Sequence, residues 1–282
     1  MRREAAAAAI VLAIAGVVVI PRLLQAVTDS MLFYPARGQH TTPDRHGIAF
    51  EERWLDADGT RIQAWWMPGE PGATTVLTFH GNAGTIADRI PWYRPVRAAG
   101  MSILAVEYRG YGDSAGAPSE RGLAADGRAG LHAARALADA QGGPLVVHGR
   151  SLGGAVAIRL AEDAAGEGIA FDGLLVESTF TSLQEMAGRT GIPLAGRLVT
   201  YAFPSLERIA RSTSPLLVVH GDADELIPFS MGERLVAAAQ PVRPARLLRI
   251  PGGTHNDTWA RGGPAYWDSV LAFFRAPGSD QR

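Results

Sequence analysis

From about residue 48 onward the chain alternates short apolar segments with longer segments rich in alanine and leucine. The first two short segments alternate apolar and polar positions, and Asp58-Gly59 between them predicts a two-residue hairpin turn. The later ones are continuous apolar runs, as expected of strands buried on both faces of a parallel sheet. We expect eight strands, at residues 50–55, 61–67, 75–80, 102–107, 145–148, 173–177, 216–220 and 245–250.

Longer segments between these strands predict helices on both faces of the sheet. A hairpin followed by repeated strand–helix units predicts an α/β fold with a mostly parallel, eight-stranded sheet. No linker divides the chain, so we expect one domain over residues 28–282. The helix candidates lie at 88–99, 121–140, 152–163, 230–239 and 258–274.

Residues 181–213 break this alternation of strands and helices. Glycines and prolines are scattered among apolar residues here, between two strands that a single helix would suffice to connect. One interpretation is a small cap inserted over the edge of the sheet. The other is a long irregular connection, and the sequence favours neither.

The N-terminus carries a run of sixteen apolar residues at 5–20, ended by Pro21 and Arg22. At about 1.5 Å per residue, such a helix covers about 24 Å of a hydrocarbon core near 30 Å thick. The following leucines lengthen the apolar stretch, and Leu24-Gln25-Ala26 is a poor cleavage site. We therefore expect an N-terminal hydrophobic helix, with residues 1–27 serving as an uncleaved membrane anchor.

The charges beside this segment predict its orientation. Arg2 and Arg3 favour a cytoplasmic N-terminus, which places the domain of residues 28–282 outside the cytoplasm, although Arg22, on the other flank, weakens this asymmetry. The alternative is a secreted protein whose N-terminal segment is removed as a signal peptide.

Composition narrows the possible chemistry. Hydrophobic residues make up 47% of the chain, which is typical of a globular protein, and 27 basic against 28 acidic residues leave no basic surplus for binding nucleic acid. The absence of cysteine excludes disulfides and thiol nucleophiles, and the absence of lysine excludes Schiff-base chemistry and a P-loop. Covalent chemistry must therefore use Ser, Thr, Asp, Glu, His or Tyr.

The strongest chemical signal is the pentapeptide Gly149-Arg150-Ser151-Leu152-Gly153. It lies between a predicted strand and a predicted helix, which is the context that a G-x-S-x-G nucleophile elbow requires. The serine of such an elbow occupies a strained turn, where side chains two residues away would collide, so those positions are glycine. Ser151 is therefore the candidate nucleophile. The alternative is an incidental serine in a glycine-rich turn.

A base and an acid follow Ser151 in the expected chain order, each just after a predicted strand. His255 would take the proton of the serine hydroxyl, and a carboxylate would accept a hydrogen bond from its Nδ1–H. Asp222, Asp224 and Glu225 are the available acids. Asp222 directly follows its strand and is suited to support the turn, so the residues favour Asp224 without deciding the choice.

Backbone N–H groups are expected to bind the oxyanion. Leu152 directly follows the nucleophile at a helix N-terminus, so its N–H is one candidate donor. The second should come from the loop His80-Gly81-Asn82-Ala83-Gly84, in which the glycines let the backbone approach a substrate oxygen. We expect the N–H of Asn82 to be this donor.

Other histidines and glycines do not indicate a cofactor. His80, His148 and His220 each end a predicted strand, but no further ligand stands at metal-binding spacing, so structural hydrogen bonds are expected. The glycines of residues 110–116 are spaced G-x-G-x-x-x-G, and Pro118 follows them instead of a helix, unlike a dinucleotide loop. We therefore expect no metal and no cofactor.

Taken together, these motifs resemble the α/β-hydrolase superfamily, in family order over about 210 residues. The family pattern H-G-x-x-D-x-x-[VI]-P places the acid at Asp224, with Ser151 as nucleophile and His255 as base. The resembling segments are HGNAG at 80–84, EYRGYGDSAGAPSE at 107–120, GRSLGG at 149–154, VVHGDADELIP at 218–228 and GGTHND at 252–257.

More narrowly, the chain resembles a branch of N-terminally membrane-anchored serine hydrolases that includes protein depalmitoylases. MLFYPAR at 31–37 is similar to the segment that follows the anchor in that branch. The resemblance implies a serine esterase or thioesterase that acts through an acyl-enzyme on a small-molecule or lipid-like acyl substrate, without a cofactor. The alternatives are an aminopeptidase-like peptidase, with Glu177 and Glu185 as candidate groups for binding a substrate amine, and a non-catalytic membrane-tethered binding protein.

Overall fold

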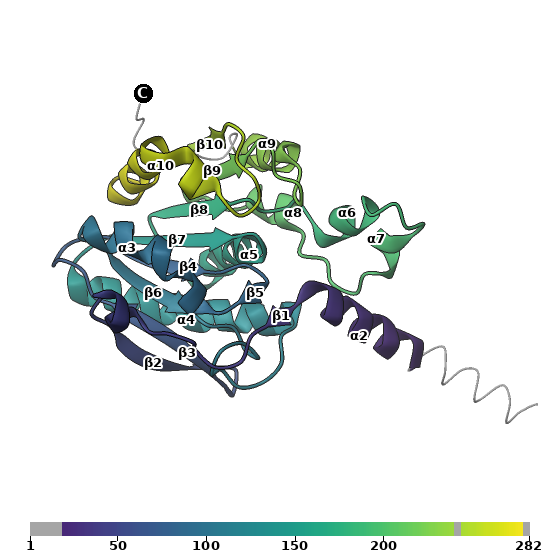
Figure 1. The fold of residues 1–282 in the computed structure, drawn as a ribbon, viewed down its shortest axis with the longest axis horizontal. Helices are drawn as coiled ribbons and strands as arrows, with labels where there is room; N and C mark the ends of the chain where they lie inside the picture. Colours follow the sequence, from purple (N-terminus) through teal and green to yellow (C-terminus); the bar gives the residue numbers. More distant parts are fainter. Residues whose placement is uncertain (1–18, 240–243, 279–282) are drawn as a thin grey trace, which may run out of the picture.

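A computed structural model describes residues 19–239 and 244–278 and contains a sheet of eight strands (Figure 1). The order of the strands is β10-β9-β8-β7-β4-β6-β3-β2, and β3 alone runs in the direction opposite to the other strands of this sheet. The prediction of a mostly parallel, eight-stranded sheet is therefore confirmed. The strands are β2 (Glu51–Ala57), β3 (Thr60–Met67), β4 (Thr75–Phe79), β6 (Ser102–Val106), β7 (Leu145–Arg150), β8 (Gly173–Glu177), β9 (Leu216–Gly221) and β10 (Ala245–Ile250).

The two-residue turn between β2 and β3 lies where the sequence predicts it. Asp58 and Gly59 have φ angles of 51° and 75°. Positive φ at both central residues is typical of a type I′ turn, whose twist matches that of the flanking strands.

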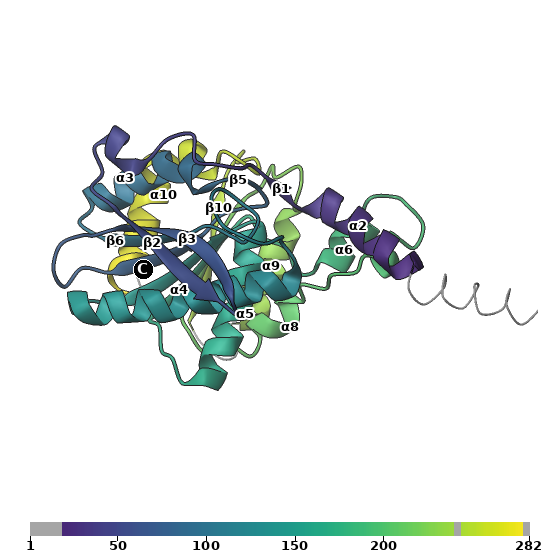
Figure 2. The same cartoon turned by 90° about the horizontal axis from the view of Figure 1, so that it is seen from below.

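Helices cover both faces of the sheet (Figure 2). Alternate side chains of a strand enter opposite layers: on β7, Val147 packs under α4 and α5 whereas Val146 packs under α3 and α10. The two layers form two apolar cores, as expected of strands that are apolar throughout. One face carries α3 (Ile90–Ala98) and α10 (Thr258–Arg275), and the other carries α4 (Glu120–Gln141), α5 (Leu152–Glu167), α8 (Ser205–Ile209) and α9 (Phe229–Ala239).

Two of the expected helices differ from the prediction. The segment expected as a helix at 88–99 begins with a 3-10 turn at Ile86–Arg89, where Thr85 and Asp88 form a capping box, and α3 follows. The segment expected at 258–274 is interrupted at Gly263, whose φ of 52° and ψ of −135° are not helical. Pro264 follows this residue, and a proline disfavours the helical conformation of the residue before it.

The segment at 181–213 forms three short helices. α6 (Leu183–Gly188) and α7 (Ala195–Leu198) project from the body of the molecule, whereas α8 packs on α5 (Figure 1). The projecting pair lies beside α2 (Ile20–Leu32), as both views show. The hydroxyl of Tyr201 donates a hydrogen bond of 2.5 Å to Asp29 of α2, which fastens the two segments together.

A small parallel sheet that the sequence analysis did not predict joins α2 to the body. It consists of β1 (Tyr34–Pro35), directly after α2, and β5 (Ala83–Gly84). The expected hydrophobic helix at the N-terminus lies almost entirely outside the described residues, which begin at Val19. Within 19–239 and 244–278, no helix combines the length and the apolar character needed to cross a membrane.

Candidate active site

Ser151 lies at the turn between β7 and α5, in a strained conformation. Its φ is 52° and its ψ is −118°, a region that residues other than glycine rarely adopt. A side chain at Gly149 would collide with the carbonyl of Gly153, and one at Gly153 would collide with the carbonyl of Phe79. The motif therefore needs both glycines for the steric reason that the sequence suggests.

The loops after β9 and β10 bring Asp224 and His255 to this turn. His255 Nε2 lies 3.1 Å from Ser151 Oγ, and His255 Nδ1 lies 2.9 Å from Asp224 Oδ2. The three side chains follow the carboxyl ends of the parallel strands β7, β9 and β10, with β8 between β7 and β9. The loops of such a sheet converge at this edge. These distances fit the arrangement that a nucleophile, a general base and an orienting carboxylate require.

Several donors surround the carboxylate of Asp224. The backbone N–H groups of Leu226 and Ile227 donate hydrogen bonds of 3.0 and 2.8 Å to its Oδ1, and His220 Nε2 lies 3.4 Å from its Oδ2. Burial acts to raise the pKa of Asp224, but the interactions with His220, His255 and Ile227 outweigh it and hold the pKa below its usual range. Asp224 is therefore ionised at neutral pH and can stabilise a charged imidazole.

Asp222, the alternative acid, faces a different part of the molecule. It accepts hydrogen bonds from the N–H of Gly252, at 2.6 Å, and from the guanidinium of Arg249, at 2.8 Å. These contacts tie the loop after β9 to β10 and its following turn. Asp222 therefore supports the loops that carry Asp224 and His255.

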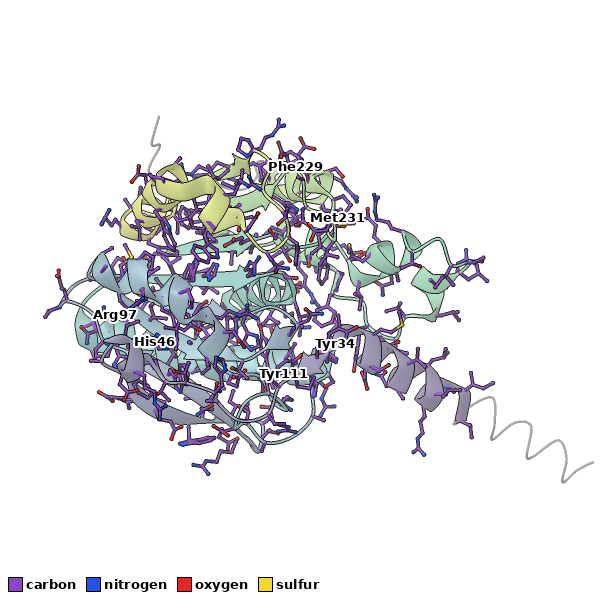
Figure 3. The ribbon with its side chains drawn as sticks, in the orientation of Figure 1. Tyr34, His46, Arg97, Tyr111, Phe229 and Met231 are labelled. Atoms are coloured by element: carbon purple, nitrogen blue, oxygen red, sulfur yellow. The ribbon has the colours of Figure 1, made fainter. Side chains whose placement is uncertain are left out.

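The loop 80–84 is held against Ser151 by hydrogen bonds to Asn82. The side-chain amide of Asn82 donates to the carbonyl of Leu32, at 2.9 Å, and the carbonyl of Asn82 accepts from the N–H of Tyr34 and the hydroxyl of Tyr111, at 2.9 and 2.8 Å. Tyr34 and Tyr111 are labelled in Figure 3. The end of α2 therefore contacts the loop that carries a candidate oxyanion donor.

The other candidate donor is the N–H of Leu152. Leu152 is the first residue of α5, and N–H groups in the first turn of a helix have no intrahelical acceptor. These N–H groups point away from the N-terminus of α5, which is the positive end of the helix dipole, toward the side of the sheet where Ser151 lies. This local geometry is suited to binding an oxyanion.

A cleft of about 540 Å³ opens above Ser151 and His255. The end of α2, the segment around α6 and the loop after β9 form its apolar walls, and arginines form part of its rim. None of its described lining residues is a carboxylate. The walls include Met31, Leu32, Phe180, Leu183, Met186, Leu226 and Ile227, and the polar part includes Arg89, Arg150 and Asn256.

Arg150, between Gly149 and Ser151, is a site residue that the sequence analysis did not identify. Its guanidinium donates to the backbone carbonyl of His255, and its Nε lies 3.6 Å from a carboxylate oxygen of Glu177. The sequence signal was its place inside the elbow motif. Nothing in the spacing indicated its partners, which lie 27 and 105 residues away.

Glu177, at the end of β8, is fully buried beneath this arginine. It accepts hydrogen bonds from the hydroxyls of Thr258 and Tyr266 on α10. Burial acts to raise its pKa, but His148, Arg150 and Thr258 outweigh this and lower the pKa to about 2. The ionised Glu177 thus joins Arg150 to α10 beneath the loop that carries His255.

The three histidines that the sequence places at strand ends lie just after β4 (His80), within β7 (His148) and next to the last residue of β9 (His220), and each has its own partner. His80 Nε2 lies 2.8 Å from the buried Glu107, His148 Nδ1 lies 2.8 Å from the hydroxyl of Thr78, and His220 Nε2 contacts the carbonyl of Ile227. In the described part of the chain, no group of three or more side chains of metal-binding type comes together.

The glycine-rich loop at 110–116 packs beneath the site. Gly112 exchanges backbone hydrogen bonds with Ala36 and Gly38, directly after β1, and Tyr111 reaches Asn82. These contacts make the loop part of the support for residues 80–84.

Comparison with known proteins identifies relatives over nearly the whole chain. Residues 70–208 match the family described as "Serine aminopeptidase, S33". The chain is 31% identical over 284 residues to the "Alpha/beta hydrolase domain-containing protein WAV2" of Arabidopsis thaliana, covering 92% of this chain and 91% of that protein. It is 32% identical over 260 residues to the "Uncharacterized membrane protein YNL320W" of Saccharomyces cerevisiae, covering 87% and 88%.

Solved structures share the architecture. The Pyrococcus furiosus esterase Pf2001 aligns with a TM-score of 0.71 and 18% identity, over 85% of this chain and 97% of that one. An alpha-beta hydrolase from Vibrio vulnificus aligns with a TM-score of 0.67 and 23% identity, over 81% and 82%. At these identities the similarity concerns the fold alone.

Proposed function

Because the chain belongs to the α/β-hydrolase superfamily, we propose that it is a serine hydrolase that cleaves carboxylic esters or thioesters. The observation that carries this proposal is the chain of contacts from Ser151 Oγ through His255 to Asp224, at 3.1 and 2.9 Å, at the base of an apolar cleft. A serine in a strained turn, a base within reach and an ionised carboxylate behind it are the parts that acyl transfer needs.

In the proposed reaction, Ser151 Oγ attacks the substrate carbonyl while His255 Nε2 takes its proton. The negative oxygen of the tetrahedral intermediate accepts hydrogen bonds from the N–H groups of Leu152 and Asn82. His255 then protonates the departing alcohol or thiol, which leaves an acyl-enzyme. Water, deprotonated by His255, attacks this ester and releases the acid and Ser151. Asp224 stabilises the imidazolium in both halves of the reaction.

The walls of the cleft support a lipid-like acyl group as the part of the substrate that binds there. Met31, Leu32, Phe180 and Met186 offer apolar surface on two sides of Ser151. Burying an acyl chain against such surface contributes about 0.8 kcal/mol for each CH₂ group. Longer acyl chains are therefore expected to bind more tightly.

The second candidate is an aminopeptidase-like activity, which the description of the matched family favours. Binding the charged amine of a peptide requires a carboxylate in the cleft. Glu177 is buried beneath Arg150, and Glu185 is paired with Arg234 at 2.6 Å, so neither faces a substrate amine freely. Arg89 and Arg150 line the cleft and would repel such an amine. This repulsion supports an ester or thioester as the substrate.

We further propose that residues 1–27 anchor the enzyme in a membrane, as in the branch that includes depalmitoylases. The apolar run at 5–20 supports this, and so does the name of the yeast relative, which calls that protein a membrane protein. Arg2 and Arg3 support a cytoplasmic N-terminus and an extracytoplasmic hydrolase domain. The alternative is a secreted enzyme without this segment.

The test is fluorophosphonate labelling of the full chain in detergent, beside Ser151→Ala and the matched control Ser30→Ala, which alters an exposed serine on α2. Labelling of the parent and the control, but not of Ser151→Ala, is expected. Acyl esters, acyl thioesters and aminoacyl anilides then identify the substrate class. A folded parent that does not react with fluorophosphonate would overturn the proposal, and cleavage of the anilides alone would replace it with the peptidase.

A further inference from the structure

The most exposed large apolar side chains of the described residues gather in one region. Ten such side chains are about half exposed or more, and nine of them lie in two segments, 19–34 and 192–198. We call these nine the apolar face. They are Val19, Ile20, Leu23, Val27, Met31, Tyr34, Ile192, Leu194 and Leu198; the tenth, Leu226, lines the cleft.

The two segments of the apolar face lie side by side. α2 and the α6–α7 segment project from the same end of the molecule in both views (Figures 1 and 2). The ring of Phe33 packs on that of Tyr201, with centroids 5.7 Å apart, and Tyr201 also bonds to Asp29. Figure 3 shows side chains standing out from both segments. Isolated exposed apolar residues are ordinary, but a gathered set marks a binding surface.

The cleft opens at the edge of this face. Met31 and Tyr34 belong to the apolar face and also line the cavity above Ser151, while Leu183 and Met186 continue the lining on the α6 side. An apolar chain that leaves the face can therefore enter the cleft along a continuous apolar surface.

The charges around the face are mostly basic. Arg22, Arg189 and Arg197 are exposed on or beside its segments. Asp29 of the first segment accepts a hydrogen bond from Tyr201, and Glu185, on α6 before the second segment, is paired with Arg234. Apolar side chains flanked by arginines are typical of segments that lie in the interface of a membrane containing anionic lipids.

We propose that the apolar face docks on a lipid bilayer, so that the cleft takes up acyl chains directly from the membrane. Continuity with the chain that precedes it selects the bilayer over a protein partner: the apolar run at 5–20 leads directly into α2, whose exposed side chains extend it. The inference rests on the proposed anchor and acyl-ester chemistry, and it adds a second contact with the bilayer and a route for the substrate.

The docked face also contacts the catalytic machinery. The carbonyl of Leu32, the last residue of α2, and the N–H of Tyr34, in β1, both bond to Asn82, whose N–H is a proposed oxyanion donor. Docking of α2 therefore holds the loop 80–84 in place from the membrane side.

The natural absence of cysteine allows a direct test with single labels on the full chain. Leu194→Cys and Leu198→Cys place a fluorophore on the apolar face. Asp139→Cys places it on exposed α4 as the control. Each labelled protein is reconstituted into vesicles of phosphatidylcholine and phosphatidylglycerol that contain lipids with spin-labelled acyl chains. We expect blue-shifted and quenched emission at positions 194 and 198 and neither change at 139.

Labels at 194 and 198 that stay as exposed to water as the label at 139, in protein tethered to the vesicles, would overturn the proposal. So would a blue shift that is already complete without lipid and is not quenched by it, because the face would then be covered by residues 1–18 or by a second copy. Both outcomes concern docking alone. Failure of the proposed hydrolase activity would instead appear as absent fluorophosphonate labelling.

A kinetic readout tests the route of the substrate. In Leu194→Asp/Leu198→Asp, charges replace two apolar contacts with the bilayer. We expect hydrolysis of a long-chain ester embedded in vesicles to fall by about tenfold, while hydrolysis of a water-soluble short-chain ester stays within about twofold of the parent. An equal loss on both esters, or no loss on either, contradicts uptake from the membrane.

Discussion

At the scale of single residues, Arg150 connects parts of the candidate site that are far apart in the chain. It precedes Ser151, donates to the carbonyl of His255 and faces the buried Glu177. The backbone of His255 is thus tied to the strand that precedes Ser151. Since the proposed base must lie within hydrogen-bond reach of Ser151 Oγ, we propose Arg150 as a positioning residue.

Replacing Arg150 is expected to slow the chemical step more than it weakens substrate binding. In Arg150→Met the carbonyl of His255 loses its donor, and we expect kcat to fall by about 10- to 100-fold with KM within about twofold. Arg150→Lys keeps the charge near Glu177 and should restore stability, but it lacks the planar fork that holds the carbonyl, so kcat should stay low. Steady-state kinetics and thermal unfolding measure both effects.

Arg94→Met, at an exposed arginine of α3, is the control and should match the parent. If Arg150→Met raises KM and leaves kcat unchanged, Arg150 binds substrate and does not position His255.

At the scale of elements, α10 shows how one residue interrupts a helix that sequence periodicity would continue. Gly263 has a φ of 52°, and Pro264 resumes the helix after it. The turn before the break carries Thr258 and the turns after it carry Tyr266, and both hydroxyls reach Glu177. The break therefore helps two separate turns of α10 to meet the same carboxylate.

A side chain at this break should destabilise the protein. Gly263→Ala adds a Cβ in a conformation that alanine disfavours, although no neighbouring atom lies within 4 Å, and we expect the free energy of unfolding to fall by about 1–3 kcal/mol. Gly166→Ala in α5 meets equally open space without a positive φ and should raise it by about 0.5–1 kcal/mol. Denaturant titration of both variants measures the two changes in the free energy of unfolding. Changes of the same sign would show that the positive φ of Gly263 does not set the cost of a side chain there.

At the scale of the whole molecule, Glu177 joins the sheet to the C-terminal helix. It ends β8 near the centre of the sheet, and its partners come from β7 and α10. Its pKa is lowered to about 2 from 4.5, so the folded protein binds this proton more weakly than the unfolded chain. The resulting stabilisation is fully present above about pH 4.5 and is lost as the pH falls toward 2.

Glu177→Gln should remove this pH dependence. We expect the free energy of unfolding at neutral pH to fall by about 3–5 kcal/mol, because Arg150 loses its buried partner. Between pH 4.5 and 2 the variant should lose less stability than the parent. Unfolding measured at a series of pH values tests this, with the exposed Glu233→Gln as control. Parallel curves for parent and Glu177→Gln would show that the carboxylate does not titrate as described.

Local features of this chain were predictable from the sequence because they depend on residues a few positions apart. Alternating and continuous apolar runs predicted all eight strands of the main sheet, and Asp58-Gly59 predicted the hairpin turn. The glycines around Ser151 predicted the strained elbow. The collision that requires Gly149 lies within the same turn, whereas the one that requires Gly153 involves the carbonyl of Phe79 on β4. The positions of Ser151 and His255, each just after a predicted parallel strand, placed both residues at one edge of the sheet, because the carboxyl ends of parallel strands share an edge. Since β8 and β9 lie between β7 and β10, the contact itself depends on the loops.

Only the tertiary structure decided which distant side chains meet. The contacts of Arg150 with His255, of Asn82 with the end of α2 and of Glu177 with α10 join residues 50 to 105 positions apart, and no periodicity encodes such pairs. The apolar face likewise combines two segments about 160 residues apart, each unremarkable alone. The sequence by itself determined the strands of the main sheet and the chemistry available, since these follow from local sterics and composition. The packing of helices on the sheet determined which of those groups act together.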